Sequence, residues 1–180
     1  MQPAAYDFKQ NFFQLFGLAE AYQLDSTALE QHYRTLQTQV HPDKFAHLSE
    51  AEQRVSMQLS TRVNEAYQTL RSPLRRARYL LTLHGVDTQE ETNTAMPVEF
   101  LMQQMEWREA VEEAQHARDI AALEEFETRL QHEMHELQRQ LAVKIDTEHD
   151  YQAAAGMVRK LRFMEKLAEE VVSAFDVIDN

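Results

Sequence analysis

Four consecutive residues, His41-Pro42-Asp43-Lys44, are the first place in the sequence where side-chain types could carry chemistry. A catalytic role for His41 would need a third group to orient the ring and a nucleophile to activate, and no Ser, Thr or Cys motif nearby supplies one. Pro42 fixes its own φ and favours an extended conformation at His41, so the turn should display the His and Asp side chains outward. The pattern favours a docking tip; the alternative is an ordinary polar loop after a helix-ending proline.

The other histidines suggest metal sites, and three motifs have spacings close to those of known metal ligands. His132-Glu-Met-His135 lacks the zinc-protease pattern, which needs the two histidines four residues apart. Glu113-Ala-Gln-His116 matches one arm of a carboxylate-bridged di-iron bundle, and Asp146-Thr-Glu-His149 is a poorer second arm. That site needs four inward-facing helices and two further Glu. Scattered solvent-facing histidines are therefore the favoured interpretation, we expect no metal and no cofactor, and a di-iron enzyme stays as an alternative.

Composition narrows the fold and excludes several kinds of site. The chain has 180 residues and no Cys, which excludes disulfides, thiolate zinc sites, a Cys nucleophile and an iron–sulfur cluster held by the chain itself. Three Gly and four Pro supply too few turns for a many-stranded fold, so we predict an all-α protein. No segment approaches the roughly 18 apolar residues of a membrane span. The first ten residues lack an apolar signal core, so we expect a cytoplasmic protein.

Charge divides the chain into two unlike halves. Residues 1–86 hold 9 Lys and Arg against 8 Asp and Glu, whereas residues 87–180 hold 9 against 22, so the net charges are +1 and −13. Between them, residues 87–96 are polar, lack periodicity and end at Pro97. We predict a first domain over 1–86, a linker over 87–96 and a second domain over 97–180. A half with a charge of −13 would be repelled by nucleic acid and by anionic membranes, so neither is an expected partner.

The first half has the patterns of four helices. A short apolar turn stops at Gly17, and a second helix begins near Ser26 and ends before Pro42. Ser49 and Glu52 form a capping box for a third helix. Ser72-Pro73 supplies an N-cap and a first-turn proline for a short fourth helix. The apolar stripe of the second helix is Leu29, Tyr33, Leu36 and Val40, and that of the third is Val55, Leu59, Val63, Ala66 and Leu70. The second and third helices should form an antiparallel pair with His41-Pro42-Asp43-Lys44 in their loop.

The second half predicts a three-helix bundle whose first helix is apolar on two sides. Phe100, Trp107, Val111 and Ala114 share one stripe, which should face the core. Val98, Leu101, Met102 and Met105 share a nearly opposite face, which continues into Glu106, Glu109, Glu112 and Glu113. Exposed apolar surface rimmed by charge is typical of a partner site. The alternative is that this second face packs against another helix.

The remaining two helices indicate where the bundle's core should lie. The middle helix has one seam, formed by Leu123, Phe126, Leu130, Leu137 and Leu141. The last helix has one stripe, formed by Met157, Leu161, Met164, Ala168, Val171, Val172 and Phe175. Phe163 lies off that stripe, so we expect a large aromatic side chain outside the core and available to the same partner.

These motifs together resemble a known family. Five segments of the first half resemble the J-domain of DnaJ-type co-chaperones. They are His41-Pro-Asp-Lys44 between two helices, Tyr33-Arg-x-Leu36, Val63-Asn-Glu-Ala-Tyr-x-x-Leu70, Ser72-Pro73 and Arg76-Ala-x-Tyr79. Two segments of the second half resemble the C-terminal domain of the HscB family, the J-proteins of bacterial iron–sulfur cluster assembly. They are Phe100-Leu-Met-x-Gln-x-Glu-x-Arg-Glu109 and Val158-Arg-Lys-Leu-Arg-Phe-Met164. The resemblance implies a J-domain that stimulates ATP hydrolysis by a DnaK-class chaperone, HscA. It also implies a helical domain that binds the scaffold protein IscU.

The resemblance assigns the candidate residues to two partners. The chaperone-binding set is Arg34, His41, Pro42, Asp43 and Lys44, and the scaffold-binding set is Leu101, Met102, Met105, Glu106, Glu109, Glu113 and Phe163. One departure concerns charge. J-domains usually carry a strongly basic outer face on the second helix, whereas that face here consists of His32, Arg34, Gln37 and Thr38, with Lys44 just beyond. The favoured interpretation is an ATPase-stimulating adaptor that is not itself an enzyme. A general J-protein for unfolded clients is the alternative.

Overall fold

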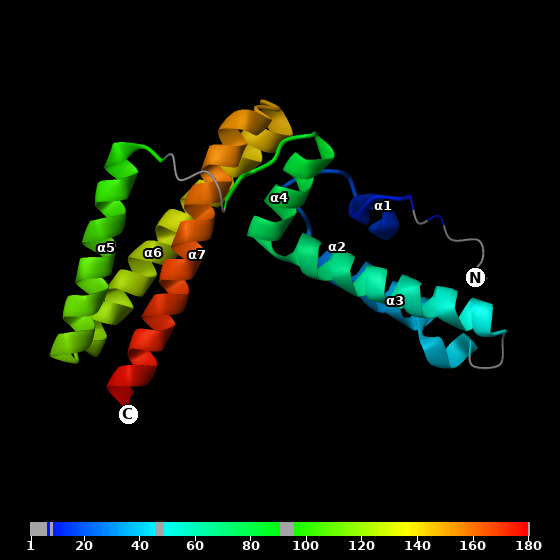
Figure 1. Cartoon of the computed structure of the whole chain (residues 1–180), viewed down its shortest axis with the longest axis horizontal. Coiled ribbons are helices and arrows are strands. Elements are labelled where there is room, and N and C mark those ends of the chain that lie inside the picture. Colours follow the sequence, from blue (N-terminus) through cyan, green and yellow to red (C-terminus); the bar gives the residue numbers. More distant parts are fainter. Residues whose placement is uncertain (1–6, 8, 46–48, 91–95, 180) are drawn as a thin grey trace. The chain divides into compact units, whose positions relative to one another are not determined.

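The computed structural model describes residues 7, 9–45, 49–90 and 96–179, and within them the regular structure is entirely helical, as predicted (Figure 1). The α-helices are α1 (Phe12–Phe16), α2 (Ser26–Val40), α3 (Glu50–Arg71), α4 (Pro73–Leu83), α5 (Val98–Ala117), α6 (Ile120–Ala142) and α7 (Tyr151–Asp179). A 3-10 turn, η2, spans Pro42–Phe45, and a π-helical turn, η3, spans Val143–Thr147. The chain divides into two compact units, and the boundary falls between Leu80 and Leu81. The domain limits predicted at 86 and 97 stay a prediction, and residues 91–95 of the predicted linker lie outside the described part.

The first unit is built around α2 and α3, which pack along each other. The Tyr33 ring of α2 stacks on the Tyr67 ring of α3 with centroids 3.9 Å apart, and the Tyr33 hydroxyl donates to Asn64 Oδ1 at 3.0 Å. Beneath them lies a core closed by α1 and α4, in which Phe13, Leu29, Val63, Leu70, Leu74 and Ala77 are at most 3% exposed. The helix pair is therefore held along its length by apolar packing and by polar contacts near its middle.

The helix ends of the first unit follow from local chemistry. Ser49 and Glu52 form the predicted capping box, in which each side chain bonds to the other residue's backbone N–H. Gly17 ends α1 with φ of 62°, a left-handed conformation that glycine adopts without a Cβ penalty. The start of α2 is capped by Asp25, whose carboxylate accepts from the N–H groups of Thr27 and Ala28. Side-chain caps thus set the start of both long helices.

The second unit contains the predicted three-helix bundle of α5, α6 and α7. The four residues of the predicted core stripe on α5 are all buried. They meet a core drawn from the other two helices that includes Leu123, Phe126, Leu130, Met164, Leu167, Val171 and Ala174. Helix α5 contacts both other helices. The face that it turns toward them is the aromatic stripe, and the opposite face is not buried in the bundle.

Helix α7 corrects two expectations. Its buried stripe includes Val158 and Leu167, both 0% exposed, whereas Val172 is 53% exposed. Val171 occupies the core position, and its neighbour in sequence is rotated by roughly 100° toward solvent. Phe163 was expected outside the core, but its ring is half-buried and packs against the core cluster. The reason is that the aromatic residues of α5 extend to the edge of the bundle and meet Phe163 there.

The core assignment of α5 predicts opposite effects for two substitutions on the same helix. Trp107→Ala should lower the free energy of unfolding by about 3 to 5 kcal/mol, because a buried indole leaves a cavity. Met105→Ala, which changes a side chain that is 72% exposed, should change it by less than about 0.5 kcal/mol. Urea unfolding of the two variants, followed by circular dichroism, measures the difference. Equal losses would mean that α5 buries both faces.

Candidate functional site

The turn between α2 and α3 displays its His and its Asp to solvent, as expected. The side chains of His41 and Asp43 are 54% and 89% exposed. The Asp43 backbone N–H donates to His41 Nδ1 at 3.3 Å, and the Asp43 carboxylate lies 3.5 Å from the same nitrogen. The turn therefore offers an imidazole ring and a carboxylate to a partner. Lys44 is also exposed, and its N–H bonds to the His41 carbonyl at 3.0 Å.

A buried hydroxyl fixes where this turn begins. Ser56 of α3 is 0% exposed, and its Oγ donates to the Val40 carbonyl at 3.0 Å. That carbonyl belongs to the last turn of α2, where no helical N–H remains to satisfy it. The bond thus ties the residue before His41 to the neighbouring helix. Ser56 was missed in the sequence because Val55 was placed on the stripe, although Ser56 continues the 3-and-4 spacing of Leu59, Val63, Ala66 and Leu70.

The outer face of α2 is close to neutral. Arg34 is its one Lys or Arg, and its guanidinium bonds to Glu30 one turn earlier on the same helix. The hydroxyls of Thr35 and Thr38 bond to carbonyls of their own helix. The charges of Glu30 and Arg34 cancel, and Lys44 supplies a cation within the turn itself. A partner that docks here therefore meets hydrogen-bonding groups more than a strong positive field.

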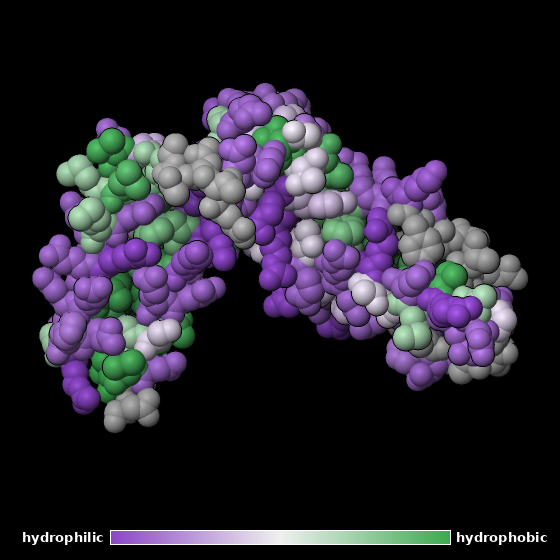
Figure 2. Space-filling view, in the orientation of Figure 1, coloured by the Kyte–Doolittle hydropathy of each residue, from purple (hydrophilic) through white to green (hydrophobic). Residues whose placement is uncertain are grey.

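The second candidate site is the outer face of α5, by which we mean Val98, Leu101, Met102 and Met105. These residues are 66%, 40%, 59% and 72% exposed, and Figure 2 shows the apolar surface at the start of α5. The acidic residues that follow them on the helix, Glu106, Glu109, Glu112 and Glu113, are exposed as well. Four apolar side chains on one helix face, next to a row of carboxylates, form a surface suited to binding a partner protein.

Phe163 is half-buried and packs against two aromatic residues of α5, and its assignment to the partner site stays a prediction. Its ring lies edge-on to Phe100 at 5.8 Å and parallel to Trp107 at 6.5 Å, between centroids. Two cations cover this cluster: Lys160 Nζ lies 5.2 Å from the Phe100 centroid, and the Arg108 guanidinium carbon lies 5.2 Å from the Phe163 centroid. Phe100 precedes Leu101 directly, so the cluster helps to position the outer face. Arg108 and Lys160 belong to the two motifs of the second half, but the sequence alone did not indicate their contacts with these rings.

Two of the histidines in these motifs make contacts with the backbone of their own segments. His116 Nδ1 lies 2.8 Å from the Glu112 carbonyl and His149 Nδ1 lies 3.0 Å from the Ile145 carbonyl, both within one helical turn. Among the described residues, no group of three or more His, Asp or Glu side chains is placed to hold a metal ion. In the same part of the chain, no helix is long and apolar enough to cross a membrane.

Comparisons with known proteins match both units. The model of the DnaJ domain matches residues 11–79, and the model of the HSCB C-terminal oligomerisation domain matches residues 96–172. The co-chaperone protein HscB homolog of Aromatoleum aromaticum is 51% identical over 96% of this chain and 98% of its own length. The homolog of Azoarcus sp. is 50% identical over 98% and 99%.

Solved structures of similar proteins share the whole fold. Chaperone HscB from Vibrio cholerae has a TM-score of 0.84 and 38% identity, over 94% of this chain and 99% of that one. The human co-chaperone protein HscB has a TM-score of 0.87 and 32% identity, over 93% and 83%. The similarity therefore covers both units and their order in the chain.

The Ser56–Val40 bond predicts a loss of stability that reaches the turn. Ser56→Ala leaves a buried carbonyl without its partner, so unfolding should become easier by about 1 to 2 kcal/mol. Hydrogen exchange of the Lys44 amide should also accelerate, because the residue before His41 is no longer held to α3. Thr61→Ala is the control: its hydroxyl bonds to a carbonyl of the same helix, Met57, at an exposed position. If the two variants behave alike, the buried bond does not hold the turn.

Proposed function

Because this chain belongs to the HscB family of J-protein co-chaperones in iron–sulfur cluster assembly, we propose that it joins two partners. One is an HscA-like DnaK-class chaperone whose ATPase it stimulates; the other is an IscU-like scaffold protein that it delivers to that chaperone. The proposal rests on one observation: of two compact units, one exposes the side chains of His41 and Asp43 in a turn, and the other exposes an apolar helix face. The chain acts as an adaptor.

The chaperone site in this proposal is the turn with its flanking cations. His41 supplies an imidazole ring, Asp43 a carboxylate for a basic group of the chaperone, and Pro42 the backbone conformation that separates them from α2. Arg34 and Lys44 add positive charge, although Glu30 balances the first. We therefore expect docking to depend more on the geometry of the turn than on electrostatic steering, and to weaken only modestly with added salt.

The scaffold site in this proposal is the outer face of α5. Leu101, Met102 and Met105 supply the apolar contacts that dominate a small interface, because desolvated apolar side chains near its centre carry most binding energy. Glu106, Glu109 and Glu113 border them and would pair with basic groups of the scaffold. Phe163, whose ring is half-buried against Phe100, completes the proposed site. A general J-protein for unfolded clients would bind extended apolar peptides on this same face, so the choice of client distinguishes the two.

The chaperone site predicts a loss of activity without a loss of fold. His41→Gln and Asp43→Asn should each abolish stimulation of the chaperone ATPase, because each removes one of the two groups that the turn presents. Both side chains lie in solvent, so the free energy of unfolding should change by no more than about 0.5 kcal/mol. Steady-state ATPase assays at subsaturating co-chaperone, with thermal melts, measure both. The control is Gln39→Ala, an exposed change on the same helix. Full stimulation by either turn variant contradicts the assignment.

The scaffold site predicts a loss of binding without a loss of fold. The triple variant Leu101→Ala, Met102→Ala, Met105→Ala should weaken binding of a purified IscU-type scaffold by at least about 2 kcal/mol, a factor of about 30. Phe163 stays intact because its ring contacts the core. Val172→Ala on α7, also exposed and apolar, should bind normally. Calorimetric titration with parallel melts decides: a variant that binds normally but melts early shows that the outer face is core. Displacement of the scaffold from the unchanged chain by an unfolded apolar peptide would favour the general J-protein.

A further inference from the structure

The sulfur atoms of the second unit differ widely in their exposure to solvent. Met102 and Met105 on α5 are 59% and 72% exposed, whereas Met164 on α7 is 2% exposed. Met96 and Met134 are partly buried and pack against the bundle core. Met102 and Met105 are three residues apart on one helix, so they lie on the same face and solvent reaches both thioethers. An oxidant in solution therefore meets these two sulfurs before those of the bundle core.

The chain offers an oxidant few competing targets. It has no Cys, whose thiolate is otherwise the first side chain to be oxidised. Its single Trp, Trp107, is 5% exposed and lies in the core of the bundle. The exposed thioethers are thus the groups of this chain that an oxidant reaches most readily. Among the described residues, Met57 of α3 is the third strongly exposed Met, and it belongs to the first unit.

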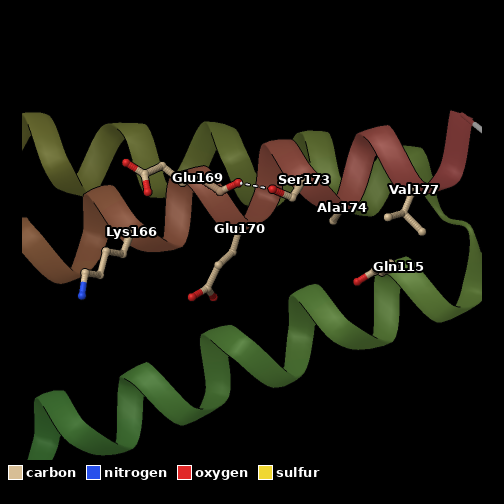
Figure 3. Close-up of a pocket in the computed structure, with 7 residues that line it drawn as sticks. All are labelled: Gln115, Lys166, Glu169, Glu170, Ser173, Ala174 and Val177. Carbon is tan, nitrogen blue, oxygen red and sulfur yellow. Dashed lines mark hydrogen bonds between the residues drawn. The ribbon is translucent and has the colours of Figure 1, made fainter.

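The groove between α5 and α7, farther along the two helices, has walls of a different kind. Figure 3 shows the Glu170 and Lys166 side chains pointing from α7 toward α5, with Gln115 on the opposite wall. The apolar residues of the lining are Ala174 and Val177. None of the described lining residues contains sulfur. A mild oxidant therefore alters the outer face of α5 and leaves this neighbouring surface as it is.

Oxygen transfer to a thioether makes an apolar side chain polar without giving it a charge. A lone pair of the Met sulfur attacks one oxygen of hydrogen peroxide, the O–O bond breaks and a sulfur–oxygen bond forms. The second oxygen leaves as water after proton transfer, so the sulfur loses two electrons and the peroxide gains them. The product is a polar, chiral sulfoxide. Burying it against an apolar surface costs the free energy of desolvating the sulfur–oxygen dipole.

We propose that Met102 and Met105 form an oxidation-sensitive site that releases the scaffold protein when peroxide is present. This inference rests on the proposed scaffold function. In the reduced state the two side chains extend the apolar contact of Leu101; in the oxidised state they place two sulfoxides where the scaffold needs an apolar surface. The chain stays folded, because neither side chain belongs to the bundle core. Methionine sulfoxide reductases reverse the change, so the loss of binding is temporary.

The turn of the first unit responds differently to the same oxidant. His41-Pro42-Asp43-Lys44 contains no sulfur, so peroxide leaves its side chains unchanged. Oxidation at α5 therefore separates the two proposed activities of the chain: delivery of the scaffold stops, whereas stimulation of the chaperone by the turn continues.

The test treats the full-length chain with hydrogen peroxide, removes the peroxide and then titrates an IscU-type scaffold calorimetrically. Peptide mass spectrometry of the same sample should find sulfoxide at Met102 and Met105 while Met164 stays reduced. Affinity for the scaffold should fall about 10-fold, and treatment with the two methionine sulfoxide reductases should restore it. The melting temperature should stay within about 2 °C of the untreated chain, because the oxidised side chains lie outside the core.

Leucine variants assign the effect to α5, because Leu keeps the size and apolar character of Met but has no sulfur. The double variant Met102→Leu, Met105→Leu should bind the scaffold within about twofold of the unchanged chain, both before and after peroxide. Met57→Leu is the matched control. It removes the exposed sulfur of α3, so peroxide should still weaken its binding as it does for the unchanged chain.

Three results contradict the inference. The first is full affinity of a chain with sulfoxide at both α5 positions while the triple alanine variant binds weakly, in which case the proposed function stands without the oxidation site. The second is an equal loss of affinity in the leucine double variant after peroxide, which places the damage elsewhere in the chain. The third is normal binding by both the oxidised chain and the triple alanine variant, which makes the proposed scaffold face itself wrong.

Discussion

A bundle of three helices can bury only one face of each helix, and this limit determines what the second unit offers to a partner. Helix α5 has apolar residues on two nearly opposite faces. The aromatic face, with Phe100 and Trp107, enters the core, since it removes more apolar area from water than the Leu and Met face would. Leu101, Met102 and Met105 are left outside. The exposed surface is thus a consequence of the bundle geometry, and a partner protein is what would complete its burial.

The first unit meets a related constraint at the end of a helix. The last carbonyls of α2 have no helical donor, and a polar side chain from α3 satisfies the one just before the turn. The turn that follows is consequently fixed at its base while its side chains stay in solvent. A base held in place with accessible side chains suits a docking tip, because little backbone conformational entropy remains to be lost when a partner binds.

The sequence predicted what depends on periodicity and local chemistry. The helix order, the capping box of Ser49 and Glu52, the end of α2 before Pro42 and the core stripe of α5 all follow from short-range patterns. What it missed depends on contacts between helices. Phe163 was expected outside the core because its own helix offered no explanation for it, yet the rings that cover it come from α5. The contacts of Ser56 and Arg108 were missed for the same reason, since the partner of each lies on another helix.

The central claim is that one chain holds a chaperone and a scaffold protein at the same time, through sites on separate units. The most direct measurement is the ATPase rate of an HscA-like chaperone with the full chain, with an IscU-type scaffold, and with both together. Simultaneous engagement predicts that the two together stimulate more than the sum of their separate effects, because delivery raises the local concentration of the scaffold at the chaperone. The same assay with the triple variant of the α5 outer face should leave only the stimulation by the turn. Simple additivity with the unchanged chain, or full synergy with the triple variant, would contradict the account.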